Sequence, residues 1–417
     1  MIVLKNITLI DSSNFQLEKG HLFIDSSKDG AYHFIEDKEI PKNAEIIECK
    51  GQLAMKAFAN GHHHAYSTLA RGMPFNSTPP KNFVEILEKV WWKLDKNLNS
   101  EMNEISALIT AISSAKNGVA AVIDHHASPF AIQGSLNNMN QAFNKCGIDS
   151  VLCYEISDRD GLNIRNQGLE ETADYLKNHD GLVGLHAAFT LSNDSLKKAA
   201  TLANKYNTGI HIHLAEAKSD QDYSIQKHGI RVVERLNNFG FFEMPKSIFA
   251  HGIHLSKREK EILSKSPAWL VQNPESNLNN QVGYFNGDSL GNNIMLGTDG
   301  MHSNMIRSAQ TAFFTGKNYE NIDMANAYQR FRNTDNYLET HFQISGNALV
   351  VLDHDSPTPI HQGNFLGHFF FGFENSQVRH LINHGQLILK DRVIPHIDEE
   401  IIKKEARKLA LKLWEKL

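Results

Sequence analysis

The sequence has few cysteines, no excess of positive charge and no long apolar run. Its 417 residues include three cysteines, Cys49, Cys146 and Cys153, which form no Cys-x-x-Cys pair and cannot all be disulfide-bonded. Such sparse cysteines are typical of a reducing compartment. Lys and Arg number 42 against 47 Asp and Glu, a net charge of −5, so the chain lacks the basic excess that neutralises nucleic-acid phosphates or anionic lipid. We therefore expect small-molecule partners and no nucleic acid.

Membrane and secretion signals are missing as well. The first residues, MIVLKNITLIDSS, are interrupted by polar side chains and lack a signal-type apolar core and cleavage site. No stretch reaches the 18 or so apolar residues that cross a bilayer. With 41% apolar and 21% charged residues, the chain has the composition of a globular protein. We expect a cytoplasmic protein with no membrane partner.

Strand-like runs divide the chain into three parts. Residues 1–55 carry short β-runs at 2–9, 21–24, 32–35 and 45–49. From about residue 56, eight apolar runs alternate with helical patterns and end near His64, Asp124, Glu155, His186, His213, His251, Gln272 and Asp299. That number of βα units predicts an α/β fold with a (β/α)8 TIM-like barrel over residues 56–340, whose active site lies at the strand C-terminal ends.

After residue 340, strand-like runs return at 349–352, 377–382 and 387–393, and residues 399–417 have the spacing of an amphipathic helix. We expect residues 1–55 and 341–417 to form a small β-sandwich built from both chain termini, with the helix closing the fold.

The 22 histidines, twice the 11 prolines, gather at the predicted strand ends. In NGHHHA the strand period of two directs His62 and His64 to one side and His63 to the other. Imidazole is a common ligand of zinc and iron, and one strand here offers two. A polar turn with incidental histidines is the alternative for this segment alone.

Three further strand ends carry similar side chains. GIHIHLAE ends in His213 with Glu216 three residues on, AHGIHL carries His251, and LGTDG carries Asp299. Alone, each is explained by a core histidine, a solvated glutamate or a turn aspartate. Together they indicate a site for one divalent metal, with Glu216 as general acid/base. The fourth strand offers His186 and neither lysine nor carboxylate, so we expect one ion and assign His186 to the substrate.

Other polar strand-end groups and an aromatic insertion are candidates for substrate binding. We include His125 and Glu155 because they end the second and third strands. Residues 74–98 form a long insertion after the first strand, and its Trp92 is our candidate for stacking on a flat ring. One buried helix face explains most of its apolar residues equally well.

The segments NGHHHAYSTLARGMP, HIHLAE, AHGIHL, NPESNLNN and LGTDG resemble the amidohydrolase superfamily, in its deaminase and chlorohydrolase branch, nearly end to end. PPKNFVEILEKVWWKLD, VIDHHASP and LHAAFTLS are similar to the SsnA-type aminohydrolases. The chain departs from the family at Lys56-Ala57, where Pro-Gly is usual, and at Gly346-Asn347-Ala348-Leu349, which lacks the family's aspartate.

The resemblance implies one zinc or iron ion held by His62, His64, His213 and Asp299. We expect the protein to be a homo-oligomer, namely a dimer. It implies that Glu216 shuttles protons, that His251 contacts the attacking water or substrate, and that Asp299 also helps to activate the water. Metal-bound hydroxide would then deaminate a nitrogen heterocycle and release ammonia. A chlorohydrolase or cyclic amide hydrolase with the same site, and a catalytically silent metal-binding barrel, are the alternatives. Glu275 and His302 receive no role.

Overall fold

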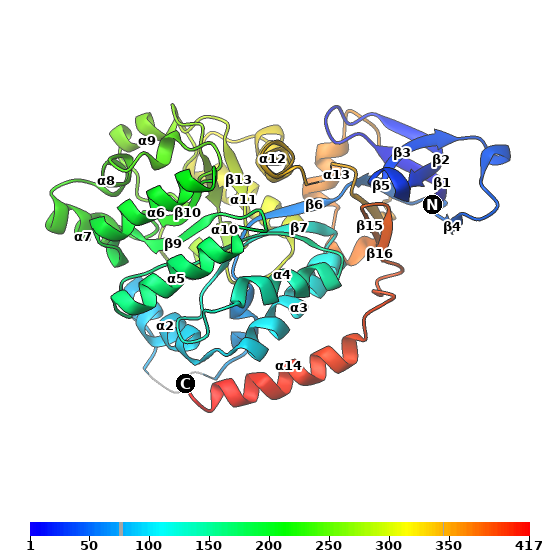
Figure 1. The fold of residues 1–417 in the computed structure, drawn as a ribbon. Helices are drawn as coiled ribbons and strands as arrows, with labels where there is room; N and C mark the ends of the chain where they lie inside the picture. The colour runs from blue at the N-terminus through cyan, green and yellow to red at the C-terminus, as the bar shows by residue number, and fades with distance from the viewer. Residues whose placement is uncertain (75–77, 345) are drawn as a thin grey trace.

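The computed structural model describes residues 1–74, 78–344 and 346–417 (Figure 1). One sheet of eight strands combines both ends of the chain in the order β16-β15-β14-β5-β1-β2-β3, with β4 paired to β1. Across the described ranges these strands form one sheet, so the expected β-sandwich is not shown. The strands are β1 (Ile2–Ile10), β2 (Leu17–Asp25), β3 (Ala31–Ile35), β4 (Glu45–Glu48), β5 (Leu53–Lys56), β14 (Leu349–Leu352), β15 (Val378–Asn383) and β16 (Gln386–Leu389).

One predicted strand is too long. We expected a strand over residues 387–393, but β16 ends at Leu389. Asp391 and Arg392 have φ values of 45° and 65°, and a left-handed backbone cannot continue a strand. The other runs predicted for the chain ends coincide with strands of this sheet, and the closing helix is confirmed as α14 (Glu399–Trp414).

The middle of the chain alternates strands and helices, which confirms the α/β class. Its strands form two parallel sheets, β6-β7-β8 and β13-β12-β11-β10-β9. They are almost wholly buried, as strands covered on both faces must be, and this is why they read as continuous apolar runs. Their bounds are β6 (Phe58–His63), β7 (Val119–His126), β8 (Asp149–Tyr154), β9 (Val183–Ala187), β10 (Ile210–Leu214), β11 (Ile248–His251), β12 (Trp269–Gln272) and β13 (Ile294–Leu296).

Isolated parallel bridges link the edges of these two sheets. Leu152 pairs with Gly181 and Ile156 with Leu185, between β8 and β9, and His63 pairs with Asp299 beyond β13. The helices are α1 (Phe83–Ile86), α2 (Trp92–Leu94), α3 (Ser100–Lys116), α4 (Ser135–Lys145), α5 (Leu162–Tyr175), α6 (Asn193–Lys205), α7 (Lys218–His228), α8 (Val232–Asn237), α9 (Lys257–Leu263), α10 (Pro274–Asn279), α11 (Met305–Tyr319), α12 (Met324–Phe342), α13 (Phe365–Phe371) and α14.

The two departures from the family pattern meet in the structure. Lys56 in β5 pairs with Leu349 in β14, and the Ala57 N–H donates to the Ala348 carbonyl at 2.8 Å. The chain therefore enters and leaves its central part through one pair of adjacent segments.

The closing helix reaches back to the segment that follows β6. Helix α14 runs along α3 (Figure 1), with Leu409 and Leu413 buried. Trp414 Nε1 donates to the Leu69 carbonyl at 2.8 Å, and Leu69 belongs to the short helix η3 (Ala65–Ala70). Among the helices of the three described ranges, none has the length and apolarity needed to cross a membrane.

Candidate active site

His62 and His64 turn their rings toward each other at the end of β6, with centroids 4.7 Å apart. His63 instead contacts Thr298 Oγ1 through its Nδ1 at 3.0 Å, which agrees with the predicted alternation. His64 Nδ1 lies 2.6 Å from the His125 carbonyl. Because a carbonyl only accepts, His64 Nδ1 carries a proton, and in the neutral ring that a metal ion requires its Nε2 presents a lone pair.

The end of β10 supplies a second imidazole in the same state. His213 Nδ1 donates to the His186 carbonyl at 2.7 Å, so its Nε2 also presents a lone pair. That atom lies 3.1 Å from His64 Nε2. Asp299, beyond β13, places Oδ1 3.0 Å from His64 Nε2 and 3.5 Å from His62 Nε2.

These donor atoms fit a divalent cation. Two Nε2 lone pairs and a carboxylate oxygen converge in a buried space, where they repel one another unless a positive charge lies between them. Burial lowers the pKa of His62 and of His213 well below 6.5, so both are neutral, as ligands must be. Although burial opposes it, the contact with Asp299 raises the pKa of His64 to about 9, so without an ion His64 Nε2 also carries a proton, which a bound metal ion would replace. This part of the site therefore favours a cation.

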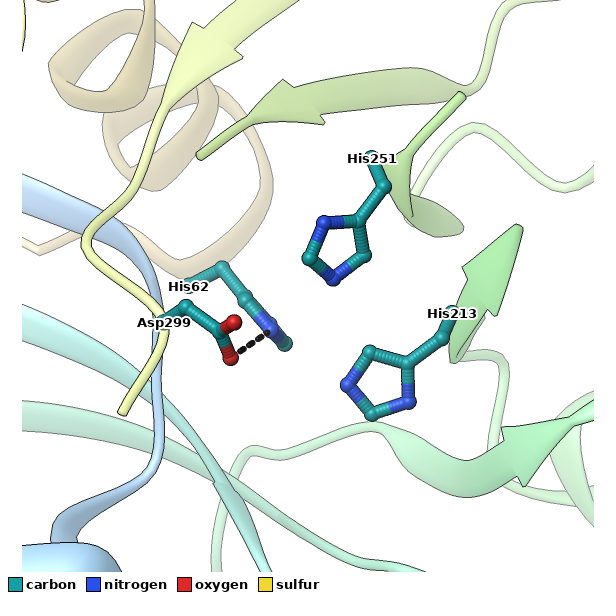
Figure 2. Close-up of side chains that lie close together, drawn as sticks. All are labelled: His62, His213, His251 and Asp299. Atoms are coloured by element: carbon teal, nitrogen blue, oxygen red, sulfur yellow. Dashed lines mark ion pairs between the residues drawn. The ribbon is translucent and has the colours of Figure 1, made fainter. Parts of the chain in front are cut away.

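His251 at the end of β11 has the opposite proton arrangement. Asn277 Nδ2 donates to His251 Nδ1 at 2.8 Å, and because an amide nitrogen only donates, the proton of His251 lies on Nε2. One ligand atom from each of His62, His213, His251 and Asp299 lies within 4.8 Å of the others. Figure 2 shows His213 and His251 directed toward the Asp299 carboxylate and His62. Position alone admits His251 as a ligand, but its Nε2 proton makes it a hydrogen-bond donor.

Glu216 lies beside His251. Its Oε2 is 3.5 Å from His251 Nε2, and its Oε1 accepts from Asn280 Nδ2 at 3.4 Å. The side chain is buried, and burial, with the charges of Asp299 and Asp220, raises its pKa well above 4.5. The carboxyl group is thus directed into the site and not toward bulk solvent. We refer to His62, His64, His213, Glu216, His251 and Asp299 together as the floor.

Three backbone positions at the floor lie in the left-handed region, at Ala215 (φ 44°), His251 (φ 75°) and Asp299 (φ 52°). Each ends or follows a parallel strand. A non-glycine residue adopts this conformation at a cost of about 1–3 kcal/mol, and such residues cluster at functional sites. The strain falls where strands turn into loops and direct their side chains inward.

Helix α10 supports three floor residues, a role that the sequence did not reveal. Ser276 Oγ donates to Asp299, while Asn277 and Asn280 donate to His251 and Glu216 as described above. Glu275, on the same helix, accepts from His302 Nε2 at 3.0 Å and from Ser308 Oγ at 2.9 Å. The two residues without an assigned role therefore anchor α10 to the segment around α11. The sequence motif NPESNLNN could be recognised, but the contacts that its side chains make could not be predicted from it.

The floor lies at the base of a cavity that opens to solvent. One side of it, which we call the wall, consists of Phe83, Leu87, Trp91, Trp92, Asp95 and Arg159. Arg159 forms an ion pair with Asp95 and lies over the Trp92 ring at 5.4 Å. The insertion after the first strand thus lines the cavity. Its residues 75–77 lie outside the described residues.

The predicted substrate contacts separate into two groups. Trp92, Glu155 and His186 line the cavity. His125 is fully buried, and its Nε2 donates to the Leu185 and His211 carbonyls at 3.1 and 3.2 Å. It lies beneath the floor, and the described lining of the cavity does not include it.

Comparisons place this geometry among known proteins. The amidohydrolase family model matches residues 53–340. The 5'-deoxyadenosine deaminase of Methanobrevibacter smithii is 26% identical over 446 aligned positions, which cover 99% of this chain and 98% of that protein. E. coli guanine deaminase has a TM-score of 0.79 at 17% identity, covering 94% of this chain and 100% of that chain.

Atrazine chlorohydrolase TrzN from Arthrobacter aurescens, complexed with zinc, has a TM-score of 0.79 at 14% identity, covering 98% of this chain and 100% of that chain. At such identities the two solved structures show a shared fold. The family match spans well over half of the chain and includes every strand that carries a floor residue. The chain belongs to the amidohydrolase family.

Proposed function

We propose that this protein is a metal-dependent hydrolase that deaminates a nitrogen heterocycle, replacing C–NH₂ by C=O and releasing ammonia. The observation that carries the proposal is the convergence of Glu216 and the His251 N–H on the imidazole and carboxylate groups at the base of one cavity. The relative named 5'-deoxyadenosine deaminase makes aminopurines and their nucleosides the first substrates to test.

We assign His62, His64, His213 and Asp299 as ligands of a divalent ion, with zinc the first choice and iron the second. Neutral imidazoles with one carboxylate are a common donor set for zinc, and the similar chlorohydrolase structure contains zinc. When bound, such an ion is a Lewis acid that lowers the pKa of water toward neutrality. Ser276 orients the Asp299 carboxylate, which also helps to activate the water.

Glu216 moves the proton. It accepts one from the attacking water and delivers it to the departing amine, as a general acid/base does. Asn280 and Asp220 hold it in place, Asn280 through the side chain and Asp220 by accepting from the Glu216 backbone N–H at 2.9 Å. The His251 N–H donates a hydrogen bond to the oxygen that adds to the ring carbon.

The ring of the substrate lies against the wall, where Trp92 offers an aromatic surface, and Glu155 and His186 meet its polar edges. His125 was predicted to join them. Its position beneath the floor supports contact with other protein groups instead.

We further propose that the two parallel sheets form one closed (β/α)8 barrel over residues 56–340. The bridges between β8 and β9 and between His63 and Asp299 support closure at both edges. Residues 1–55 and 341–417 would form the second domain, and a common apolar cluster from β1, β2, β5, β14 and β15 supports its folding into a sandwich. The homodimer remains a prediction, as does the cytoplasmic location, which the free, buried cysteines support.

The test is ammonia release from a panel of aminated purines, nucleosides, pyrimidines and triazines. We expect turnover of at least one, its loss on chelation, and its recovery when zinc is restored. Chloride release from a chlorinated triazine, or a ring-opened acid from a cyclic amide, would assign the site to the alternative hydrolases. Metal binding with no turnover of any compound would contradict the deaminase proposal.

A further inference from the structure

We propose that the base of the cavity has a second metal-ion position, formed by His125 and Glu155 beside the first. Neither residue belongs to the ligand set assigned above. The inference rests on the proposed metal centre but not on the identity of the substrate.

The first observation is the proton arrangement of His125. Its Nε2 must carry a proton, because both of its partners, at 3.1 and 3.2 Å, are backbone carbonyls. Its Nδ1 is buried and has no hydrogen-bond partner within the described ranges. Glu155 Oε2 lies 3.3 Å from this nitrogen.

His125 Nδ1 thus faces the Glu155 carboxylate across 3.3 Å, where either a proton on Nδ1 or a bound metal ion can join the two groups. A lone pair and a carboxylate at this distance repel each other unless a positive charge joins them, and a metal ion supplies that charge as well as a proton does. Both side chains are nearly completely buried, with Glu155 at 6% exposure and His125 at 0%.

The second observation is that two more lone pairs face the same space. One ligand atom from each of His64, His125, Glu155 and His213 lies within 4.8 Å of the other three. His64 and His213 present Nε2 lone pairs because their Nδ1 protons are bound by backbone carbonyls. Three imidazoles and one carboxylate make a donor set that suits zinc.

With both ions bound, one imidazole of the four-ligand set assigned above would pass from the first ion to the second, so that each ion has three protein ligands. One ion takes His62 and Asp299, the other takes His125 and Glu155, and His64 and His213 provide one imidazole to each. Three protein ligands with open positions are typical of catalytic zinc. The sequence argued for one ion because the fourth strand offered no anion. In the structure the anion comes instead from Glu155, which directly follows β8.

Metal counting tests the proposal. The purified chain is stripped with a chelator, dialysed against zinc, and its metal content measured by mass spectrometry. We expect two zinc ions per chain in the wild type and one in Glu155→Gln, which keeps the side chain's shape and removes its charge. Asp299→Asn should also lose one. Glu170→Gln, at an exposed position on α5, is the matched control and should retain two.

Saturation of the wild type at one ion would overturn the proposal, and a proton on His125 Nδ1 would then satisfy Glu155. An unchanged content in folded Glu155→Gln would also overturn it. If that variant does not fold, as judged by circular dichroism, anomalous diffraction from zinc-loaded wild-type crystals decides between two peaks and one. Ammonia release by a one-ion protein would refute the second position alone, whereas two ions without turnover would refute the deaminase proposal alone.

Discussion

The floor and the wall of the cavity are held in place by different means. On the floor, His64 and His213 are fixed by hydrogen bonds to backbone carbonyls of neighbouring strands. On the wall, Trp92, Asp95 and Arg159 hold one another through a side-chain ion pair and a ring contact. Backbone carbonyls are present whatever the neighbouring residue is, whereas each wall contact depends on both of its side chains.

Because of this difference, we expect the floor residues to determine the rate of the chemical step and the wall residues to determine substrate selectivity. The sheet dictates the orientations and Nδ1 proton positions of His64 and His213, which suits groups that must meet a reacting atom within a few tenths of an ångström. Apart from Arg159, which follows β8, the wall side chains lie on short, irregular helical turns between β6 and α3, where substitutions adjust shape without disturbing the strands. We expect floor changes to lower kcat and wall changes to raise KM.

The largest effect is expected for Glu216→Gln. The amide cannot exchange a proton, and general acid/base groups contribute about 10²–10⁴-fold, so kcat should fall by that factor while KM and metal content stay near wild type. Steady-state ammonia release measures it. The control is Glu261→Gln, an exposed helix position. Turnover undiminished in Glu216→Gln would remove Glu216 from the mechanism.

Asn277→Asp tests whether α10 sets the proton of His251. The change keeps the side chain's shape but replaces the amide donor with an acceptor, which draws the proton to Nδ1 and leaves Nε2 unable to donate. We expect kcat to fall about 10–100-fold, a typical effect for a residue that orients a catalytic group, with little change in KM. Asn326→Asp, at an exposed position of α12, is the control. A change confined to KM would place Asn277 with the wall.

Trp92→Phe tests the wall. Trp92 Nε1 is buried and finds no acceptor in the described part of the chain, so it is available to a ring nitrogen or oxygen. Loss of one hydrogen bond of about 1 kcal/mol corresponds to a KM about fivefold higher, with kcat within about twofold. If kcat falls as far as in the floor variants, the separation of floor and wall is wrong.

His384→Gln tests stability away from both regions. A hydrogen bond from His384 to Asp149 and the charge of Asp29 raise the pKa of His384 to about 9 despite partial burial. Since this exceeds the ordinary 6.5, the stabilisation is complete below pH 6.5 and is lost as the pH rises through 9. His384 is 43% exposed, so we expect at most about 1 kcal/mol, a difference of about 1–2 °C. Thermal melts at pH 6 and pH 9.5 should show a larger loss for the wild type than for the variant.

The sequence predicted the strands and the residues at their ends. Because side chains alternate along a strand, the separation of His62 and His64 from His63 followed from local order alone. Continuous apolar runs located the parallel strands because strands covered on both faces are buried along their whole length. The break at Asp391 and Arg392 was missed because a left-handed backbone at a non-glycine residue leaves no clear mark in the sequence.

The sequence did not predict contacts between distant segments. Asp95 and Arg159 are 64 residues apart, and their pairing depends on how the insertion folds over the strands. His125 ends a strand like the floor histidines, but only the structure shows that two carbonyls bind its Nε2. The proton positions that distinguish His64 from His251 likewise depend on three-dimensional neighbours.

The hydrogen bond from Trp414 to the Leu69 carbonyl has a consequence for the order of events during synthesis. Strand β6 is translated early, but Leu69 in the short helix η3 that follows it is bonded by a residue 345 positions later in the chain. The ribosome must therefore add 345 further residues after Leu69 before this hydrogen bond can form.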